Sequence, residues 1–489
     1  MTKRAELFSS RWGMILAMLG MAVGTGNIWR FPRVAATNGG GSFLVAWVCF
    51  LLLWSVPLIM VEFAMGKSTR FGTIGAFVRN MGRRFAWLGA WVAWTAIAIM
   101  CYYAVVTGWT IRYTLGALLG QVGQGEPGAL WNAFAWTPSV IFFQGVALLL
   151  GVVVVARGVR GIESAAKVLM PSLIVMVVIL AIRAVTLPGA SAGLEFLFTP
   201  HWSDLAHPRI WLEALTQNAW DTGAGWGLIL TYSIYMRRRE DTALNAFMLG
   251  FGNNSVSLLA GIMVLCTVFS MMPDASQQIV GADNTGLTFI WVPQLFAVMP
   301  GGRWFMVLFF AALFFAAWTS LISMIELAVR VLQDMGVNRT RALAATAGLG
   351  FALGIPSALR ADIFNNQDFV WGVGLMVSGL FFALAALRYG ARRFRETLIN
   401  GPHSDIRIGR WWDYAIGLVA VEAVVLIGWW FWQVRGDDPW SQYGVGLMAA
   451  QWGATLVLLL ALNGWMARRI EAQGVRAEPP AGGMPPSIP

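Results

Sequence analysis

Charged side chains are scarce in this sequence. Asp, Glu, Lys and Arg make up only 12% of its 489 residues, whereas 58% of the residues are hydrophobic. An ordinary soluble protein has about 25% charged residues. The scarcity of charge therefore excludes a typical soluble protein and indicates a chain that is largely embedded in a lipid bilayer.

Cysteine and histidine are also rare, which excludes several chemistries. Cys49, Cys101 and Cys266 are dispersed and favour neither a disulfide framework nor a metal site. The three histidines have no metal-ligand spacing. The chain also has no phosphate-binding loop, nucleophile elbow or nucleotide fingerprint. We therefore expect neither an enzyme nor an ATP-driven pump.

Long apolar runs, in contrast, are abundant. A transmembrane helix needs about 20 mostly apolar residues, whereas a membrane-spanning β-barrel would show short segments of alternating hydrophobicity. The sequence predicts an all-α polytopic membrane protein with about twelve transmembrane helices, at residues 12–34, 42–66, 84–120, 138–157, 163–187, 210–236, 243–272, 303–335, 341–358, 368–390, 411–435 and 441–468.

Basic residues are distributed unevenly between the two sides of these spans. The net charge is +10, and most of the 34 Lys and Arg residues fall near the N-terminus, in alternate loops and in the C-terminal tail. The loop at residues 270–300 has none. This positive-inside pattern predicts cytoplasmic termini in a bacterial-type inner membrane, with lipid rather than nucleic acid as the surrounding partner. No pattern predicts an oligomeric state.

Two apolar runs are interrupted by glycines, one in each half of the chain. The first interruption is Gly20–Asn27 and the second is Asp221–Gly227. A broken helix at membrane depth exposes backbone groups, which is tolerated only where they line a protected cavity. Matching breaks in two halves indicate the midplane binding site of a secondary transporter. A passive channel and a membrane-embedded enzyme explain paired breaks less well.

The segment from Gly20 to Gly41 resembles the first-span signature of the neurotransmitter:sodium symporter family. Further matches extend through most of the chain: Glu62–Gly66 at the end of the second span, Gly161 and Pro171 in the fifth, Gly193–Pro200 in the third extracellular loop and Ala316–Ser320 in the eighth span. The resemblance implies two inverted five-helix repeats with broken first and sixth helices, at 12–187 and 188–390. A cytoplasmic N-terminus (1–11) precedes them, and peripheral spans (391–470) and a disordered cytoplasmic tail (471–489) follow.

The same resemblance implies a sodium-coupled symporter that imports a small zwitterion by alternating access. We expect an apolar or aromatic amino acid as substrate. Two alternatives remain open: a transporter of an amine or amino-acid derivative, and an amino-acid sensor of the same fold that does not transport.

Two sodium ions are implied by the family pattern. The first would be bound by the carbonyls of Gly20, Val23 and Ala316 and by the hydroxyls of Thr319 and Ser320. The alternative is that both hydroxyls bond only to their own helix backbone. The second ion would be bound by the Ala22 carbonyl and by the side chains of Asn27, Asn253 and Asp221.

Asp221 departs from the family pattern, which has a hydroxyl residue there. Many relatives bind chloride beside this ion; Gln217, Asn253 and Ser257 match that anion site, but Trp47 stands in place of a tyrosine. A fixed carboxylate repels chloride and supplies its charge, so we expect transport that does not require chloride. Binding of substrate, proton exchange and a protonated structural carboxyl remain open as other roles of Asp221.

The substrate would bind between the two breaks. Backbone amides at Thr25 and Gly26 and the Tyr103 hydroxyl suit a carboxylate, and carbonyls at positions 22, 220 and 221 suit an ammonium group. The expected lining is Met21, Ala22, Thr25, Gly26, Ile99, Tyr103, Trp220, Asp221, Gly223, Trp226, Leu321 and Met324.

Two gates follow from the same resemblance. Arg30 and Asp368 would pair on the outer side, beneath which Tyr103 and Trp226 would form an aromatic lid. On the cytoplasmic side Asp334 would pair with Arg4.

Overall fold

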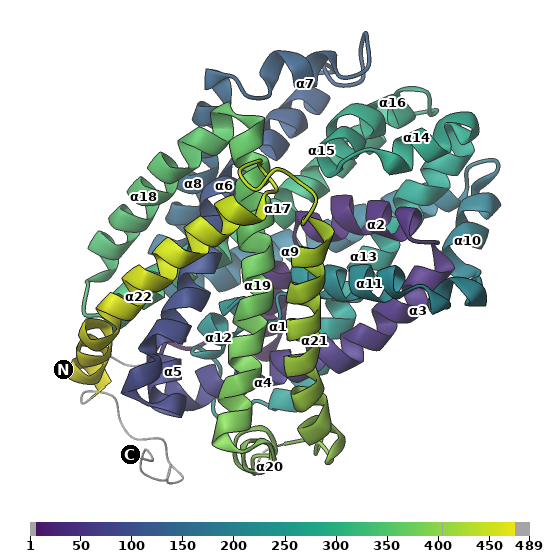
Figure 1. Cartoon of the computed structure of the whole chain (residues 1–489). Helices are drawn as coiled ribbons and strands as arrows, with labels where there is room; N and C mark the ends of the chain where they lie inside the picture. The colour runs from purple at the N-terminus through teal and green to yellow at the C-terminus, as the bar shows by residue number, and fades with distance from the viewer. Residues whose placement is uncertain (1–5, 403, 475–489) are drawn as a thin grey trace.

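The computed structural model describes residues 6–402 and 404–474, and within this part of the chain every regular element is a helix. Figure 1 shows the long helices packed side by side, with α5 (Thr73–Met81) and α20 (Ala391–Phe394) at one end of the molecule. The short helices α7 (Ala129–Phe134), α14 (Ser276–Gly281) and α16 (Val292–Ala297) lie at the other end. The predicted all-α class is therefore confirmed.

Eleven of the expected spans are found as long apolar helices in the described residues. Ten are unbroken: Gly41–Thr69 (α3, η2 and α4), Arg83–Leu118 (η3 and α6), α8 (Pro138–Ala156), α9 (Gly158–Val185), α13 (Thr242–Met271), α17 (Gly302–Asp334), α18 (Arg339–Leu359), α19 (Ala361–Tyr389), α21 (Trp411–Gln433) and α22 (Val445–Gly474). The eleventh is the bent pair Arg11–Ala22 (α1) and Gly26–Thr37 (η1 and α2), with an angle of 55°. The twelfth is divided into α11 (Pro208–Asp221) and α12 (Leu228–Ser233).

The remaining helices are short connectors between the spans. They include α10 (Ala190–Phe198), η4 (Trp202–Ala206), η5 (Pro273–Ala275), α15 (Asn284–Gly286), η6 (Leu287–Trp291) and η7 (Arg395–Ile399). One predicted boundary is wrong: residues 471–474 belong to α22 rather than to a disordered tail, because the helix continues through the polar residues after the apolar run. The rest of the predicted tail lies outside the described residues.

Both predicted breaks interrupt the helices where the glycines occur. At the first break, between α1 and η1, the Asn27 side chain accepts a hydrogen bond from the Gly24 amide at 2.8 Å. At the second break, Gly223, Gly225 and Gly227 have φ angles of +72°, +87° and +78°, which other residues rarely adopt. The carboxylate of Glu62 on α4 accepts from the Gly225 amide at 2.6 Å and from the Leu230 amide at 3.1 Å. Side chains thus satisfy backbone groups that the interrupted helices leave free.

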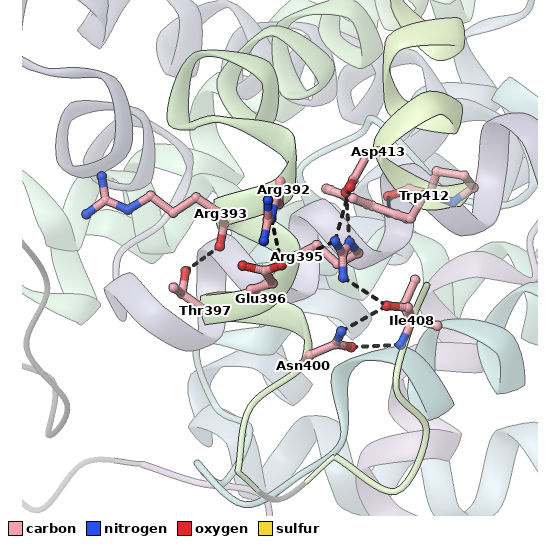
Figure 2. Close-up of polar contacts among 10 residues, drawn as sticks. Arg392, Arg393, Arg395, Glu396, Thr397, Asn400, Ile408, Trp412 and Asp413 are labelled. Atoms are coloured by element: carbon pink, nitrogen blue, oxygen red, sulfur yellow. Dashed lines mark hydrogen bonds and ion pairs between the residues drawn. The ribbon is translucent and has the colours of Figure 1, made fainter. Parts of the chain in front are cut away.

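A polar clamp fixes the connection between α19 and α21 (Figure 2). The buried Arg395 guanidinium donates to both carboxylate oxygens of Asp413, at 2.8 and 3.1 Å. Asn400 exchanges two hydrogen bonds with the backbone of Ile408, at 2.9 and 2.8 Å. The Ile406 amide then donates to Asp241, which caps α13. These contacts tie the segment that precedes α21 to the start of α13.

Candidate functional site

A cavity of about 260 Å³ lies between the two breaks. Its wall includes residues from both breaks. The first break supplies Met21, Ala22, Gly24, Thr25, Gly26 and Asn27, and the second supplies Trp220, Asp221, Gly223 and Trp226. Ten of the twelve residues expected to bind substrate line this cavity. The other two, Ile99 and Leu321, are fully buried and are not on its wall, so this part of the prediction is wrong. Their apolar side chains pack into the helix core instead.

Several residues of the cavity wall were missed by sequence reasoning. Gly24, Trp29, Tyr102, Val106 and Leu228 also line the space, as does Ser320, which was expected only at the first ion. Glycine, aromatic and branched apolar residues are frequent throughout the chain, so no sequence signal distinguishes these positions. Asp283, Asn284, Asn365 and Tyr443 extend the same cavity toward the end of the molecule that holds α7 and α16.

The Tyr103 hydroxyl occupies the amide end of the first break. It accepts from the Thr25 amide at 3.1 Å and from the Thr25 hydroxyl at 3.2 Å. The Thr25 amide was expected to face substrate directly, but here the tyrosine takes that hydrogen bond. The polar end of the cavity therefore presents a phenol rather than a bare amide at this position.

The residues expected around the first ion come together where α1 ends against α17. The Ser320 hydroxyl lies 3.4 Å from the carbonyl oxygens of both Met21 and Val23. The Thr319 hydroxyl bonds to its own helix, at 2.9 Å to the Phe315 oxygen and 3.1 Å to the Ala316 oxygen. Gly20 faces Thr319, because a Cβ on Gly20 would lie 3.3 Å from the Thr319 Cβ. The Ser320 hydroxyl thus contacts the first break, whereas the Thr319 hydroxyl bonds to the backbone of its own helix.

The residues expected around the second ion form one buried network. Asn27 donates to the Asn253 side chain at 3.0 Å and to the Ser257 hydroxyl at 2.8 Å. Ser257 and Gln217 each donate to Oδ2 of Asp221 at 3.1 Å. Side chains from α11 and α13 therefore donate to a single carboxylate oxygen, and Asn27 of the first break is linked to it through Ser257.

Two oxygens in this network have no hydrogen-bond partner within the described part of the chain: Oδ1 of Asp221 and Oε1 of Gln217. Both are buried, and an unsatisfied buried acceptor is costly. Oxygen ligands suit hard cations such as sodium. Described residues form no cluster of three or more His, Cys, Asp or Glu side chains that would suit a transition metal. The donor set fits a bound alkali cation.

Trp47, which was expected beside this network, makes no hydrogen bond to its residues in the described part of the chain. Its indole packs against Phe31 with ring centroids 4.6 Å apart and the ring planes tilted by 46°, and its carbonyl accepts from Asn218. The indole nitrogen is buried and has no partner in residues 6–402 and 404–474.

The expected outer ion pair is not formed in this structure. Arg30 and Asp368 both line the cavity, but no salt bridge joins them in the described residues. The guanidinium of Arg30 instead lies over the Trp220 ring, 5.1 Å from its centroid. The aromatic pair also differs from the expected one, since Trp226 packs edge-on against Trp220 at 5.9 Å rather than against Tyr103. Both charged residues therefore line the cavity without pairing with each other in the described part of the chain.

On the inner side, Asp334 has partners other than the expected one. It pairs with Arg330 at 2.9 Å and accepts from the Gly72 amide, while Arg4 lies outside the described residues. An arginine four residues away on the same helix satisfies this acid locally.

Three buried acids that sequence reasoning did not assign anchor the inner half. Glu62 holds the second break, Glu326 accepts from Tyr235 at 2.5 Å and from Arg339 at 2.7 Å, and Glu163 accepts from Ser9 at 2.5 and 2.7 Å. The sequence did contain a signal for such residues, because an isolated acidic residue within an apolar span usually has a specific partner or role.

Comparison with known proteins gives consistent matches over nearly the whole chain. A family model described as the sodium:neurotransmitter symporter family matches residues 5–137 and 137–468. An uncharacterized sodium-dependent transporter of Bacillus subtilis is 31% identical over 440 residues, 86% of this chain and 96% of that protein. Another, from Methanocaldococcus jannaschii, is 30% identical over 439 residues, 85% of this chain and 88% of that protein.

A solved structure is also similar. The crystal structure of MhsT in complex with L-phenylalanine matches with a TM-score of 0.75 and 28% sequence identity. The match covers 86% of this chain and 98% of the MhsT chain.

Proposed function

Because the chain belongs to the sodium:neurotransmitter symporter family, we propose that it imports an apolar or aromatic amino acid together with two sodium ions and without chloride. It is a sodium-dependent multi-pass membrane transporter and not an enzyme. The proposal further assigns it to a bacterial-type inner membrane with both termini in the cytoplasm, in agreement with the basic loops. The two inverted repeats, 12–187 and 188–390, belong to the same proposal.

The cavity between the two breaks is the observation that carries this proposal. It combines an aromatic wall with a phenol and a buried oxygen network, which suits a zwitterion with an apolar side chain. The phenylalanine bound by MhsT supports this substrate class by likeness. Sodium would favour the state that is open to the outside, and substrate would permit the outer gate to close. Rocking of the helices that hold the breaks would then open the inside.

A second candidate substrate is an amine without a carboxylate. Asp221 lines the same cavity, and its free carboxylate oxygen would attract an ammonium group. Uptake of aromatic amines in preference to the matching amino acids would favour this candidate. Sodium-dependent binding without any substrate-driven sodium flux would favour a sensor.

We expect uptake to depend on sodium through the hydroxyls that face the first break. In proteoliposomes with an inward sodium gradient, Thr319→Ala/Ser320→Ala should reduce initial L-phenylalanine uptake by about tenfold or more, the scale of one to two lost ligand contacts. Ser323→Ala is the matched control, because this buried serine of α17 donates only to the Ser320 carbonyl of its own helix. Equal wild-type uptake when potassium replaces sodium would contradict the symporter mechanism.

The outer gate should require both of its charged residues. Arg30→Ala and Asp368→Ala should each slow uptake severalfold, because closure of the cavity leaves the remaining charge buried without its partner. Initial rates in proteoliposomes measure this effect. Asp362→Ala provides the control, since Asp362 lies on the same helix, is exposed and pairs with Arg360. If both gate variants transport like the wild type, the gate assignment is wrong.

A further inference from the structure

Exposed arginines gather where three long apolar helices end side by side. Arg83–Leu118 begins there, and Ala361–Tyr389 and Val445–Gly474 end there. Figure 1 shows the C-terminal end of α22 beside α5, and the two helices are in contact. Five arginines around these helix ends are exposed and form no ion pair with a described residue, and we call them the basic patch: Arg79, Arg84, Arg388, Arg468 and Arg469.

Direct contacts join the elements that hold the basic patch. The Asn463 side chain of α22 accepts from the Trp87 amide at 3.0 Å and donates to the Arg83 carbonyl at 3.2 Å. The Arg388 guanidinium, at the end of α19, lies over the Phe85 ring of η3. Because α22 also contacts α5, which holds the first arginine of the patch, the four elements form one continuous surface.

Three arginines of the basic patch lie against aromatic rings rather than acids. The guanidinium of Arg388 is 4.7 Å from the centroid of the Phe85 ring. Arg79 and Arg469 lie over rings in the same way, at 5.4 and 5.7 Å. A guanidinium over a ring face keeps the N–H groups at its edge available. The rings therefore orient these charges without neutralising them.

The position and the charge of the basic patch fit a phosphate group at the membrane surface. Trp465, which lies under Arg469, is 43% exposed, and tryptophan is enriched at the level of lipid headgroups. Arginine binds phosphate through its planar fork of donors, and clusters of basic residues next to membrane spans attract anionic lipids. Each of these features favours a lipid headgroup over a soluble anion.

We propose that the basic patch binds the headgroup phosphate of an anionic phospholipid. In the topology proposed above, this lipid belongs to the cytoplasmic leaflet. The inference goes beyond the proposed function, since the basic patch is remote from the cavity between the breaks and its ligand is neither substrate nor sodium. Its test therefore needs no measurement of uptake.

The test follows the apparent melting temperature of the purified protein in a neutral detergent. Short-chain phosphatidylglycerol is added, and phosphatidylcholine with the same chains and glycerol 3-phosphate serve as comparisons. We expect phosphatidylglycerol alone to raise the melting temperature of the wild type. In Arg84→Gln/Arg388→Gln/Arg469→Gln the concentration that gives half of this effect should rise by about tenfold or more, because each arginine near an anionic headgroup adds to the affinity.

Two further variants separate a specific site from a general effect of charge. Arg157→Gln/Arg160→Gln/Arg341→Gln is the matched control, because it removes three exposed arginines from loops assigned to the same side, and none of them lies over a ring of a described residue. It should respond to phosphatidylglycerol like the wild type. Phe85→Leu keeps every charge but removes the ring under Arg388, so it should weaken the response severalfold, and it tests the site even if the triple variant does not fold.

Three results would overturn the inference and leave the proposed transport untouched. The first is an equal rise in melting temperature with phosphatidylcholine, and the second is an equal loss of response in the control variant. The third is a rise with glycerol 3-phosphate as large as that with phosphatidylglycerol, which would indicate a site for soluble phosphate. Conversely, absence of sodium-dependent amino-acid uptake would overturn the proposed function without affecting the lipid site.

Discussion

Sodium-driven uptake by the wild-type protein should persist when gluconate replaces chloride and should collapse in Asp221→Ser. Sodium ions in a dry cavity need a nearby negative charge, and two opposite unit charges about 4 Å apart attract by about 4 kcal/mol at the effective dielectric of a protein. Loss of that attraction corresponds to roughly a thousandfold weaker ion binding. Two measurements, each made with and without chloride, test this expectation. Initial uptake reports whether transport needs chloride, and sodium-dependent thermal stability reports how strongly each variant binds sodium.

Two further variants show that charge is responsible. Asp221→Asn keeps the shape and one acceptor oxygen but loses the charge, and it should fail like Asp221→Ser. In Asp221→Ser/Trp47→Tyr, which restores the residue types of the chloride-binding pattern, chloride should return part of the uptake. Wild-type uptake that stops without chloride would refute this role, and binding of a substrate ammonium group would be the next role of Asp221 to test.

The overall architecture could be predicted because apolar length and glycine position are local properties. Each expected stretch corresponds to a helix or helix pair, and the breaks lie where glycines permit positive φ angles or where Asn27 replaces a backbone partner. The i,i+4 spacing of Gln217 and Asp221 likewise places both on one helix face. The binding roles of these residues stay predictions.

Contacts across the bundle could not be predicted, because they depend on how distant segments pack. The family pattern paired Arg30 with Asp368, but in the open cavity the nearby Trp220 ring offers the guanidinium a contact without closure. Ile99 and Leu321 have the residue type of a cavity wall, yet the packing of their helices places both side chains in the core. The carboxylate of Glu62 serves amides 163 and 168 residues away, which no local pattern reveals.

Glu62→Gln should abolish most uptake while leaving the helical spans in place. The carboxylate is fully buried and accepts from two amides, one at Gly225 within the second break and one at Leu230 in the first turns of α12. A carboxamide has one acceptor oxygen, and its NH2 group would face an amide donor instead. Leaving a buried N–H without a partner costs about 1–3 kcal/mol, more where the lost acceptor is charged. The break would lose its fixed geometry, and with it the position of Asp221 and Trp226 on the cavity wall.

The measurement pairs uptake with sodium-dependent stabilisation of purified Glu62→Gln, which should retain its helical circular dichroism. Uptake below about a tenth of the wild-type rate is expected from a loss of this size. Glu422→Gln is the matched control, because Glu422 on α21 is also a buried acid, but its Oε2 has no hydrogen-bond partner in the described chain. A general intolerance of amides at buried acidic positions would impair both variants, whereas support of the break predicts loss in Glu62→Gln alone. Glu62→Gln that transports and binds sodium like the wild type would show that the interrupted helix keeps its shape without this carboxylate, and the glycines alone would then have to account for the break.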